Sequence, residues 1–127
     1  MKKISKGNLL DLVALMAENQ QVYLPVKANG ETNYARYTEG AEVDIDTLKT
    51  VKSAKEVFFP QSETLYTVVT ENKKYKITQQ ELQNEEFVLF GVRPCDVKGI
   101  EVLDRVFLTD PVDSFYKARR EHGIIVS

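Results

Sequence analysis

The one cysteine of this 127-residue chain stands where a thiol can do chemistry. Cys95 belongs to the segment Arg93-Pro94-Cys95-Asp96, which follows an apolar run and precedes a helical pattern. The N-terminus of a helix presents unsatisfied N–H groups and a partial positive charge, and both favour a thiolate, as does a neighbouring arginine. Ligands of open α/β sheets also bind at the carboxyl ends of strands. The segment is therefore a candidate cofactor or metal site.

Each residue of this segment also has a purely structural interpretation. Most free cysteines behave as small buried hydrophobes, and Cys95 can be one of them. Arg93 can hold an anion or stabilise the thiolate, or it can form an ordinary ion pair. Asp96 can cap the helix, because its carboxylate meets the N-terminal dipole. Four residues alone do not decide between these interpretations.

The composition limits what metal chemistry the chain can perform by itself. It contains one Cys and one His, whereas a structural zinc site needs four ligands and an iron–sulfur cluster about four cysteines. If Cys95 is a ligand, most of the others must come from outside these residues. No nucleophile–base pair is recognisable either, and His122 is expected to interact with the C-terminus of its own helix.

The last forty residues predict a β-α-α-β unit. Residues 87–92 form a continuous apolar run, as in a strand buried on both faces. Apolar residues then recur at helical spacing over 97–108, and a charged helix is predicted over 113–122. Residues 124–126 read as a second apolar strand. This order indicates a right-handed parallel crossover.

The N-terminal part predicts a helix followed by a hairpin. Residues 8–20 have the apolar spacing of an amphipathic helix, with Asn8 as its cap. The dipeptide Asn29-Gly30 supplies the positive φ angles of a tight turn between two strands. Because a proline cannot donate to a ladder, Pro25 predicts that its strand lies at an edge of the sheet.

The middle of the chain predicts a second hairpin, with strands over 64–70 and 74–78. A short helix is predicted over 46–55, and another over 79–82 with Thr78 as its cap. The fold class is thus α/β or α+β, with an N-terminal helix, β-hairpins, a C-terminal β-α-α-β unit and a small mixed sheet.

Length and charge indicate one ordinary domain covering residues 1–127. The net charge of −2 provides no basic footprint for nucleic acid, and no apolar stretch approaches the length of a membrane span. We therefore expect a cytoplasmic protein, and a single cysteine agrees with a reducing compartment. Because the chain stops one residue after a buried-type strand, it is expected to be the N-terminal fragment of a longer polypeptide.

Several segments carry a family resemblance. Residues 90–96, 103–108, 116–121 and 124–126 resemble the β (iron–sulfur) subunit of cytosolic sulfhydrogenases, and they resemble the A-type subunit of anaerobic sulfite reductase equally. Residues 55–65 resemble the same family. Together these segments cover most of the chain in the right order.

The resemblance implies an electron-transfer subunit that works with catalytic and flavin or electron-carrier subunits. Its [4Fe–4S] clusters would lie in a cysteine-rich segment of the longer protein, so none is expected in these residues alone. Arg93, Cys95 and Asp96 match the motif as cofactor-binding candidates, with Cys95 as a metal ligand. The leading hypothesis is a scaffold and docking domain of an oxidoreductase complex, itself not catalytic. A non-catalytic interaction domain with a buried Cys95 comes second, and a small thiol enzyme using Cys95 third.

Overall fold

The computed structural model describes residues 3–47, 49–71 and 73–127. A mixed four-stranded sheet has the strand order β2-β1-β5-β6, and two further strands pair only with each other. β1 is antiparallel to β2, whereas β5 is parallel to both of its neighbours. The strands are β1 (Gln21–Ala28), β2 (Glu31–Arg36), β3 (Tyr66–Glu71), β4 (Lys74–Gln79), β5 (Phe87–Phe90) and β6 (Gly123–Val126). The predicted α+β class and small mixed sheet are confirmed.

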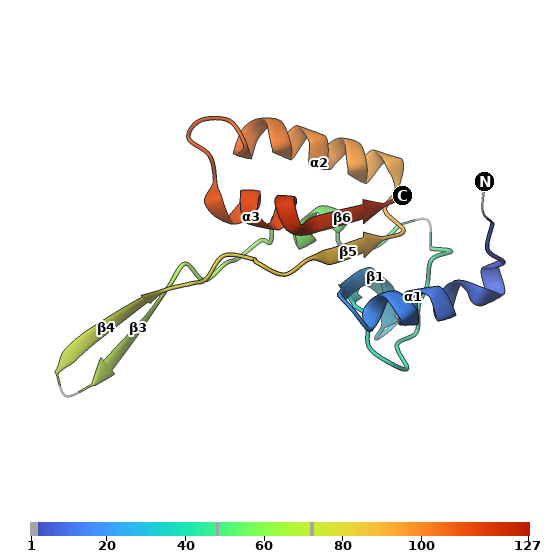
Figure 1. Cartoon of the computed structure of the whole chain (residues 1–127), viewed down its shortest axis with the longest axis horizontal. Helices are drawn as coiled ribbons and strands as arrows, with labels where there is room; N and C mark the ends of the chain where they lie inside the picture. Colours follow the sequence, from blue (N-terminus) through green and yellow to red (C-terminus); the bar gives the residue numbers. More distant parts are fainter. Residues whose placement is uncertain (1–2, 48, 72) are drawn as a thin grey trace.

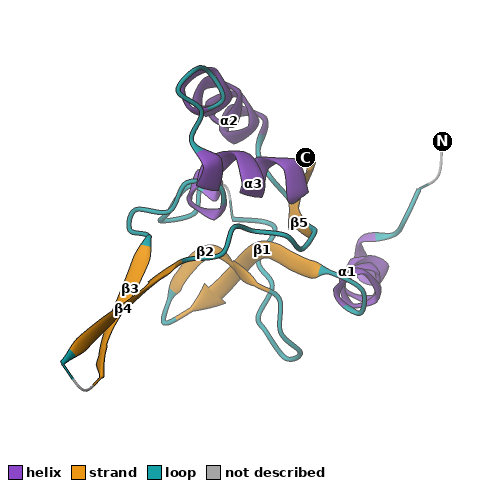
Figure 2. Cartoon of the chain, turned by 60° about the vertical axis from the view of Figure 1, so that its left-hand side comes forward, coloured by secondary structure: helices purple, strands orange, loops and turns teal. Residues whose placement is uncertain are grey.

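Helices cover both faces of this sheet. Helix α1 (Leu9–Ala17) lies by β1 on one side, whereas α2 (Pro94–Phe107) and α3 (Ser114–His122) lie together on the other (Figures 1 and 2). The described residues also form two short 3-10 helices, η1 (Lys6–Asn8) and η2 (Ala54–Val57). None of the helices in the described ranges is long and apolar enough to span a membrane.

Strand β5 divides the core into two clusters. Phe87 and Leu89 point to one face and pack in the cluster that includes Tyr116 of α3. Val88 points to the other face and packs in the cluster that includes Val13 of α1. All three strand residues are buried, so the predicted strand with two apolar faces is confirmed.

The first hairpin has the predicted turn, but its first strand is not at an edge. Asn29 and Gly30 adopt φ angles of 52° and 81°, as a tight hairpin turn requires. β1 lies between β2 and β5, so the edge prediction from Pro25 is wrong. The proline is tolerated because the parallel pairing with β5 ends at Tyr23. Beyond that point the carbonyl of Pro25 accepts a hydrogen bond of 2.9 Å from the N–H of Asp44.

The helix predicted over 46–55 is wrong for the described residues of that range, apart from the start of η2. The N–H of Val51 donates to the carbonyl of Thr32 at 3.1 Å, so this backbone group bonds to the first hairpin and not within a helix. The Ser53 hydroxyl caps η2 by accepting a hydrogen bond of 3.3 Å from the N–H of Lys55.

The second hairpin is confirmed, with each strand ending one residue later than predicted and β3 beginning two residues later. Thr78 belongs to β4 and caps no helix, and the predicted helix over 79–82 is absent from this described stretch. The N–H of Gln80 donates to the carbonyl of Leu65 at 2.9 Å and closes the base of the hairpin. The β3–β4 hairpin, called the arm below, projects away from the rest of the molecule (Figure 1).

The C-terminal β-α-α-β unit is confirmed, with parallel pairing of β5 and β6. α2 begins at Pro94, three residues before the predicted start. The Asp113 carboxylate caps α3 by accepting a hydrogen bond of 2.8 Å from the N–H of Tyr116. Asn8 stands at the cap position of α1, but its side chain makes no capping hydrogen bond with the described chain, so that prediction is wrong.

Candidate functional site

The predicted site lies at the junction between β5 and α2. Gly91 follows the strand with a φ of +76°, a conformation that glycine adopts without the usual steric cost. Arg93 is the extended residue before the helix, and Pro94 occupies the first turn. Proline fits there because its fixed φ suits a helix and its missing N–H would have no helical partner. The helix therefore starts at the proline and places Cys95 in its first turn.

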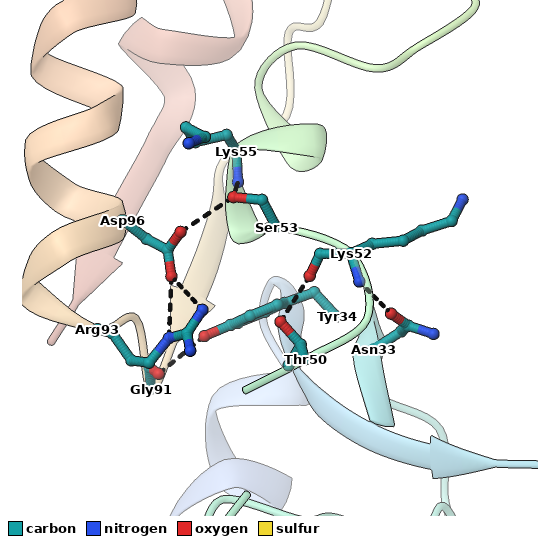
Figure 3. Close-up of polar contacts among 9 residues, drawn as sticks. All are labelled: Asn33, Tyr34, Thr50, Lys52, Ser53, Lys55, Gly91, Arg93 and Asp96. Carbon is teal, nitrogen blue, oxygen red and sulfur yellow. Dashed lines mark hydrogen bonds and ion pairs between the residues drawn. The ribbon is translucent and has the colours of Figure 1, made fainter. Parts of the chain in front are cut away.

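Asp96 is the anchor of this turn. Its side chain is buried, and one carboxylate oxygen accepts hydrogen bonds from Nε and Nη2 of Arg93 at 3.0 and 2.9 Å. The other oxygen accepts from the Ser53 hydroxyl at 3.0 Å (Figure 3). The carboxylate thus faces side chains, so the prediction that Asp96 caps the helix is wrong. It still stands in the first turn, where the helix dipole favours a negative charge.

Arg93 forms the ion pair that its structural interpretation predicted. Its guanidinium and the Asp96 carboxylate approach to 2.9 Å. The hydrogen bond to Asp96 raises the pKa of this guanidinium, and partial burial opposes the shift. Arg93 thus holds the carboxylate of the residue three positions further on.

Cys95 is exposed, so the alternative in which it is a small buried hydrophobe is wrong. The thiol lies in the first turn of α2 between the two residues that form the ion pair. It is near enough to Arg93 and Tyr34 to contribute to the electrostatics of both groups. The structure therefore brings together Arg93, Cys95 and Asp96, and it presents the thiol to solvent.

Tyr34 and Ser53 are partners of the site that sequence reasoning missed. The Tyr34 hydroxyl, on β2, donates a hydrogen bond of 2.8 Å to the carbonyl of Gly91. Burial raises the pKa of Tyr34, and the negative charge of Asp96 adds to that shift. A serine directly before a short helix is a capping signal that could have drawn attention to Ser53. Nothing in the sequence links Tyr34 to a loop 57 residues away.

A cavity of about 290 Å³ adjoins this arrangement. Tyr34 and Ser53 belong both to the cavity wall and to the hydrogen bonds around α2. The wall consists of Tyr23, Tyr34, Lys52, Ser53, Glu56, Val57 and Pro60. Aromatic rings and one ion pair, Lys52 with Glu56 at 3.5 Å, thus line a small space beside the start of α2.

The site does not form a metal centre by itself. In the part of the chain that the structure describes, no group of three or more His, Cys, Asp or Glu residues is placed to hold a metal ion. A [4Fe–4S] cluster needs about four thiolates, so these residues fit at most one ligand position, that of Cys95. His122 lies at the end of α3, where its Nδ1 is 2.8 Å from the carbonyl of Ala118, as expected for a helix C-terminus.

Comparison with known proteins identifies a relative among the hydrogenases. No protein-family model matches the chain, and no solved structure matches it. Sulfhydrogenase 2 subunit beta of Pyrococcus furiosus is 31% identical over 111 residues, which are 87% of this chain and 32% of that subunit. The chain thus spans about a third of the length of the curated relative. Over most of its own length, the chain is a distant homologue of a sulfhydrogenase beta subunit.

Proposed function

We propose that the chain is a scaffold and docking domain of an iron–sulfur electron-transfer subunit in a hydrogenase-type oxidoreductase complex. The observation that carries this proposal is the 111-residue match to a protein named as a hydrogenase subunit. In such a complex the domain would contact catalytic and flavin or electron-carrier subunits. A relationship to the A-type subunit of anaerobic sulfite reductase stays a prediction from sequence motifs.

The proposed role of the site is to hold one thiol in a fixed position at the domain surface. Cys95 is exposed, and the loop that carries it is tied by the Arg93–Asp96 ion pair and the Ser53 hydrogen bond. Rigid support from neighbouring groups is what a metal ligand needs. We propose Cys95 as one ligand of a [4Fe–4S] cluster whose other ligands lie outside these residues, with Arg93 and Asp96 as its supports.

The test compares two products prepared under anaerobic conditions. One is the 127-residue chain, and the other is the product of the complete reading frame that encodes it. Iron and acid-labile sulfide are measured in both, together with Cys95→Ala variants. We expect clusters in the complete product, none in the 127-residue chain, and loss of iron in the complete product when Cys95 is replaced.

Each outcome bears on a separate part of the proposal. Iron that is retained by the Cys95→Ala variant would leave the scaffold role in place and remove the ligand role. A complete product without iron or sulfide would overturn the electron-transfer function. The Glu101→Ala variant serves as a control that should keep its iron, because it breaks only the exposed Lys98–Glu101 pair of α2 and leaves Cys95 and its supports in place.

A further inference from the structure

The arm is built with one apolar face and one polar face. Cross-strand partners and alternate residues of a strand share a face, and Val68 of β3 is opposite Ile77 of β4. One face therefore carries Tyr66, Val68, Thr70, Tyr75, Ile77 and Gln79. The other carries Thr67, Val69, Glu71, Lys74, Lys76 and Thr78. The first set contains no charged residue, and the second contains three.

In the described part of the chain, the apolar face of the arm remains open to solvent. Its four large apolar side chains, Tyr66, Val68, Tyr75 and Ile77, are between 57% and 76% exposed. A two-stranded hairpin alone is marginally stable in water, and a contiguous exposed apolar patch marks an interaction site. This face therefore needs an occupant.

We propose that a second copy of this chain covers the apolar face, with two arms stacked face to face around a twofold axis. The face is uncharged, so stacking it on itself brings no like charges into contact. A partner recognised through charge would meet the lysines on the opposite face instead. Because only one face is apolar, a pair of arms closes on itself and leaves its polar faces in water.

The order of side chains along the apolar face allows it to pack against the same face of a second copy that is related by a twofold axis. With the arms antiparallel, the axis passes near the middle of the hairpin, so Val68 faces Val68 and Ile77 faces Ile77 of the other copy. The Tyr66 ring then lies opposite the smaller Thr70, and the Tyr75 ring lies opposite Gln79. Large groups meet small ones at both ends, and aliphatic groups meet at the centre. The antiparallel arrangement also keeps the two bodies at opposite ends of the paired arms.

The available area sets the strength of the pairing. The four apolar side chains present on the order of 500 Å² per chain, taking about 150 Å² for each tyrosine and about 100 Å² for each aliphatic residue. Two copies then bury on the order of 1,000 Å², the lower limit for a specific interface. The pair is therefore a weak, concentration-dependent dimer, and this inference does not depend on the electron-transfer function.

The test measures the mass of the 127-residue chain by sedimentation equilibrium over a range of concentrations. We expect a reversible monomer–dimer equilibrium in the micromolar range. Ile77→Lys places a charge at the centre of the apolar face and should raise the dissociation constant at least about tenfold. Thr78→Lys adds the same charge at the next residue of β4, which lies on the polar face of the arm. This variant should leave the dissociation constant unchanged.

A cross-linking experiment keeps the proposal testable if a charged variant unfolds the arm. In a Cys95→Ser background, Val68→Cys should be joined to its own copy by a short bismaleimide. Lys76→Cys, on the polar face, should not be joined. A chain that stays monomeric at the highest soluble concentration, or equal cross-linking at positions 68 and 76, would overturn the proposal and assign the face to a different protein.

Discussion

At the residue scale, the Arg93–Asp96 ion pair, whose residues flank Cys95 in the first turn of α2, carries the main contacts of the candidate site. The Asp96 carboxylate is buried and accepts from both Arg93 and Ser53. Removal of this carboxylate takes away the hydrogen bonds that it accepts from Arg93 and from Ser53. Asp96 therefore connects the stability of the domain to the position of the thiol.

Asp96→Ala should lower the free energy of unfolding by about 2 kcal/mol, because hydrogen bonds to a charged group are lost and Arg93 is only partly exposed. Urea denaturation measures the change. Glu101→Ala on the same helix is the matched control, since it breaks the exposed Lys98–Glu101 pair, which contributes at most about 0.5 kcal/mol. Equal losses in the two variants would contradict the anchoring role of Asp96.

The ionisation of Asp44 makes the stability of the folded chain depend on pH. Hydrogen bonds from the hydroxyl and N–H of Thr47 and from the Thr32 hydroxyl hold the pKa of Asp44 below its ordinary value of 3.8. The unfolded carboxylate takes up a proton at a higher pH than the folded one, so this stabilisation is complete above the unfolded pKa. It is lost as the pH falls through the folded pKa.

The expected result is that Asp44→Ala is less stable than the native chain at neutral pH and that the difference shrinks below about pH 4. Urea denaturation midpoints at a series of pH values provide the measurement. A difference that is constant down to the lowest pH at which the chain folds would show that ionised Asp44 contributes nothing.

The exposure of Cys95 predicts stoichiometric labelling without unfolding. One equivalent of a thiol-reactive disulfide should react in the native chain to the same extent as in urea. Cys95→Ala should label in neither condition and should change the free energy of unfolding by less than about 0.5 kcal/mol, because it removes a surface side chain. A thiol that reacts only in urea would restore the buried interpretation.

The residues of the site could be predicted from the sequence only in part. Arg93, Cys95 and Asp96 were identifiable because a strand-to-helix junction is a local signal. Which groups contact one another was not, because Ser53 lies 43 residues from Asp96 along the chain. Contacts of that kind are fixed by the packing of the whole domain.

At the element scale, the sequence predicted strongly periodic segments and failed on short polar ones. β5, α2 and the two hairpins have apolar patterns or turn residues that agree with their structure. The helix predicted over 79–82 had a capping signal at Thr78 and little else, and the helix predicted over 46–55 was short and had no capping signal. Since a short isolated helix is unstable in water, competing hydrogen bonds to a neighbouring strand displace it.

The packing at the start of β6 leaves no room for a side chain at Gly123. A Cβ at this position would lie 2.4 Å from Cε1 of Phe58 and 2.7 Å from Cζ of Phe87. Both rings are buried, so Gly123→Ala should destabilise the chain by about 1–3 kcal/mol through overpacking. Gly7→Ala is the control in thermal denaturation, because a Cβ there meets nothing within 4 Å. Equal stability of the two variants would contradict this packing.

At the scale of the whole molecule, the arm and the body are separate in their strand pairing. Replacing residues 66–79 by two glycines should leave the sheet and both clusters of the core intact, because Leu65 and Gln80 already meet at the base of the arm. The thermal midpoint should change by less than about 4 °C, which corresponds to less than about 1 kcal/mol. Unfolding of the shortened chain at room temperature would show that the arm is required by the body.

The central position of β5 has a consequence for how the molecule opens. Val88 and Leu89 are buried on opposite faces, and the strand is hydrogen-bonded along both edges. No local fluctuation can expose their amides without breaking the sheet and opening a cluster of the core. These amides should exchange their hydrogens with solvent at the rate set by global unfolding, and they should be the slowest in the chain. Among the strands, those of the arm should exchange fastest in dilute solution, so the timing of exchange would distinguish the arm from the four-stranded sheet.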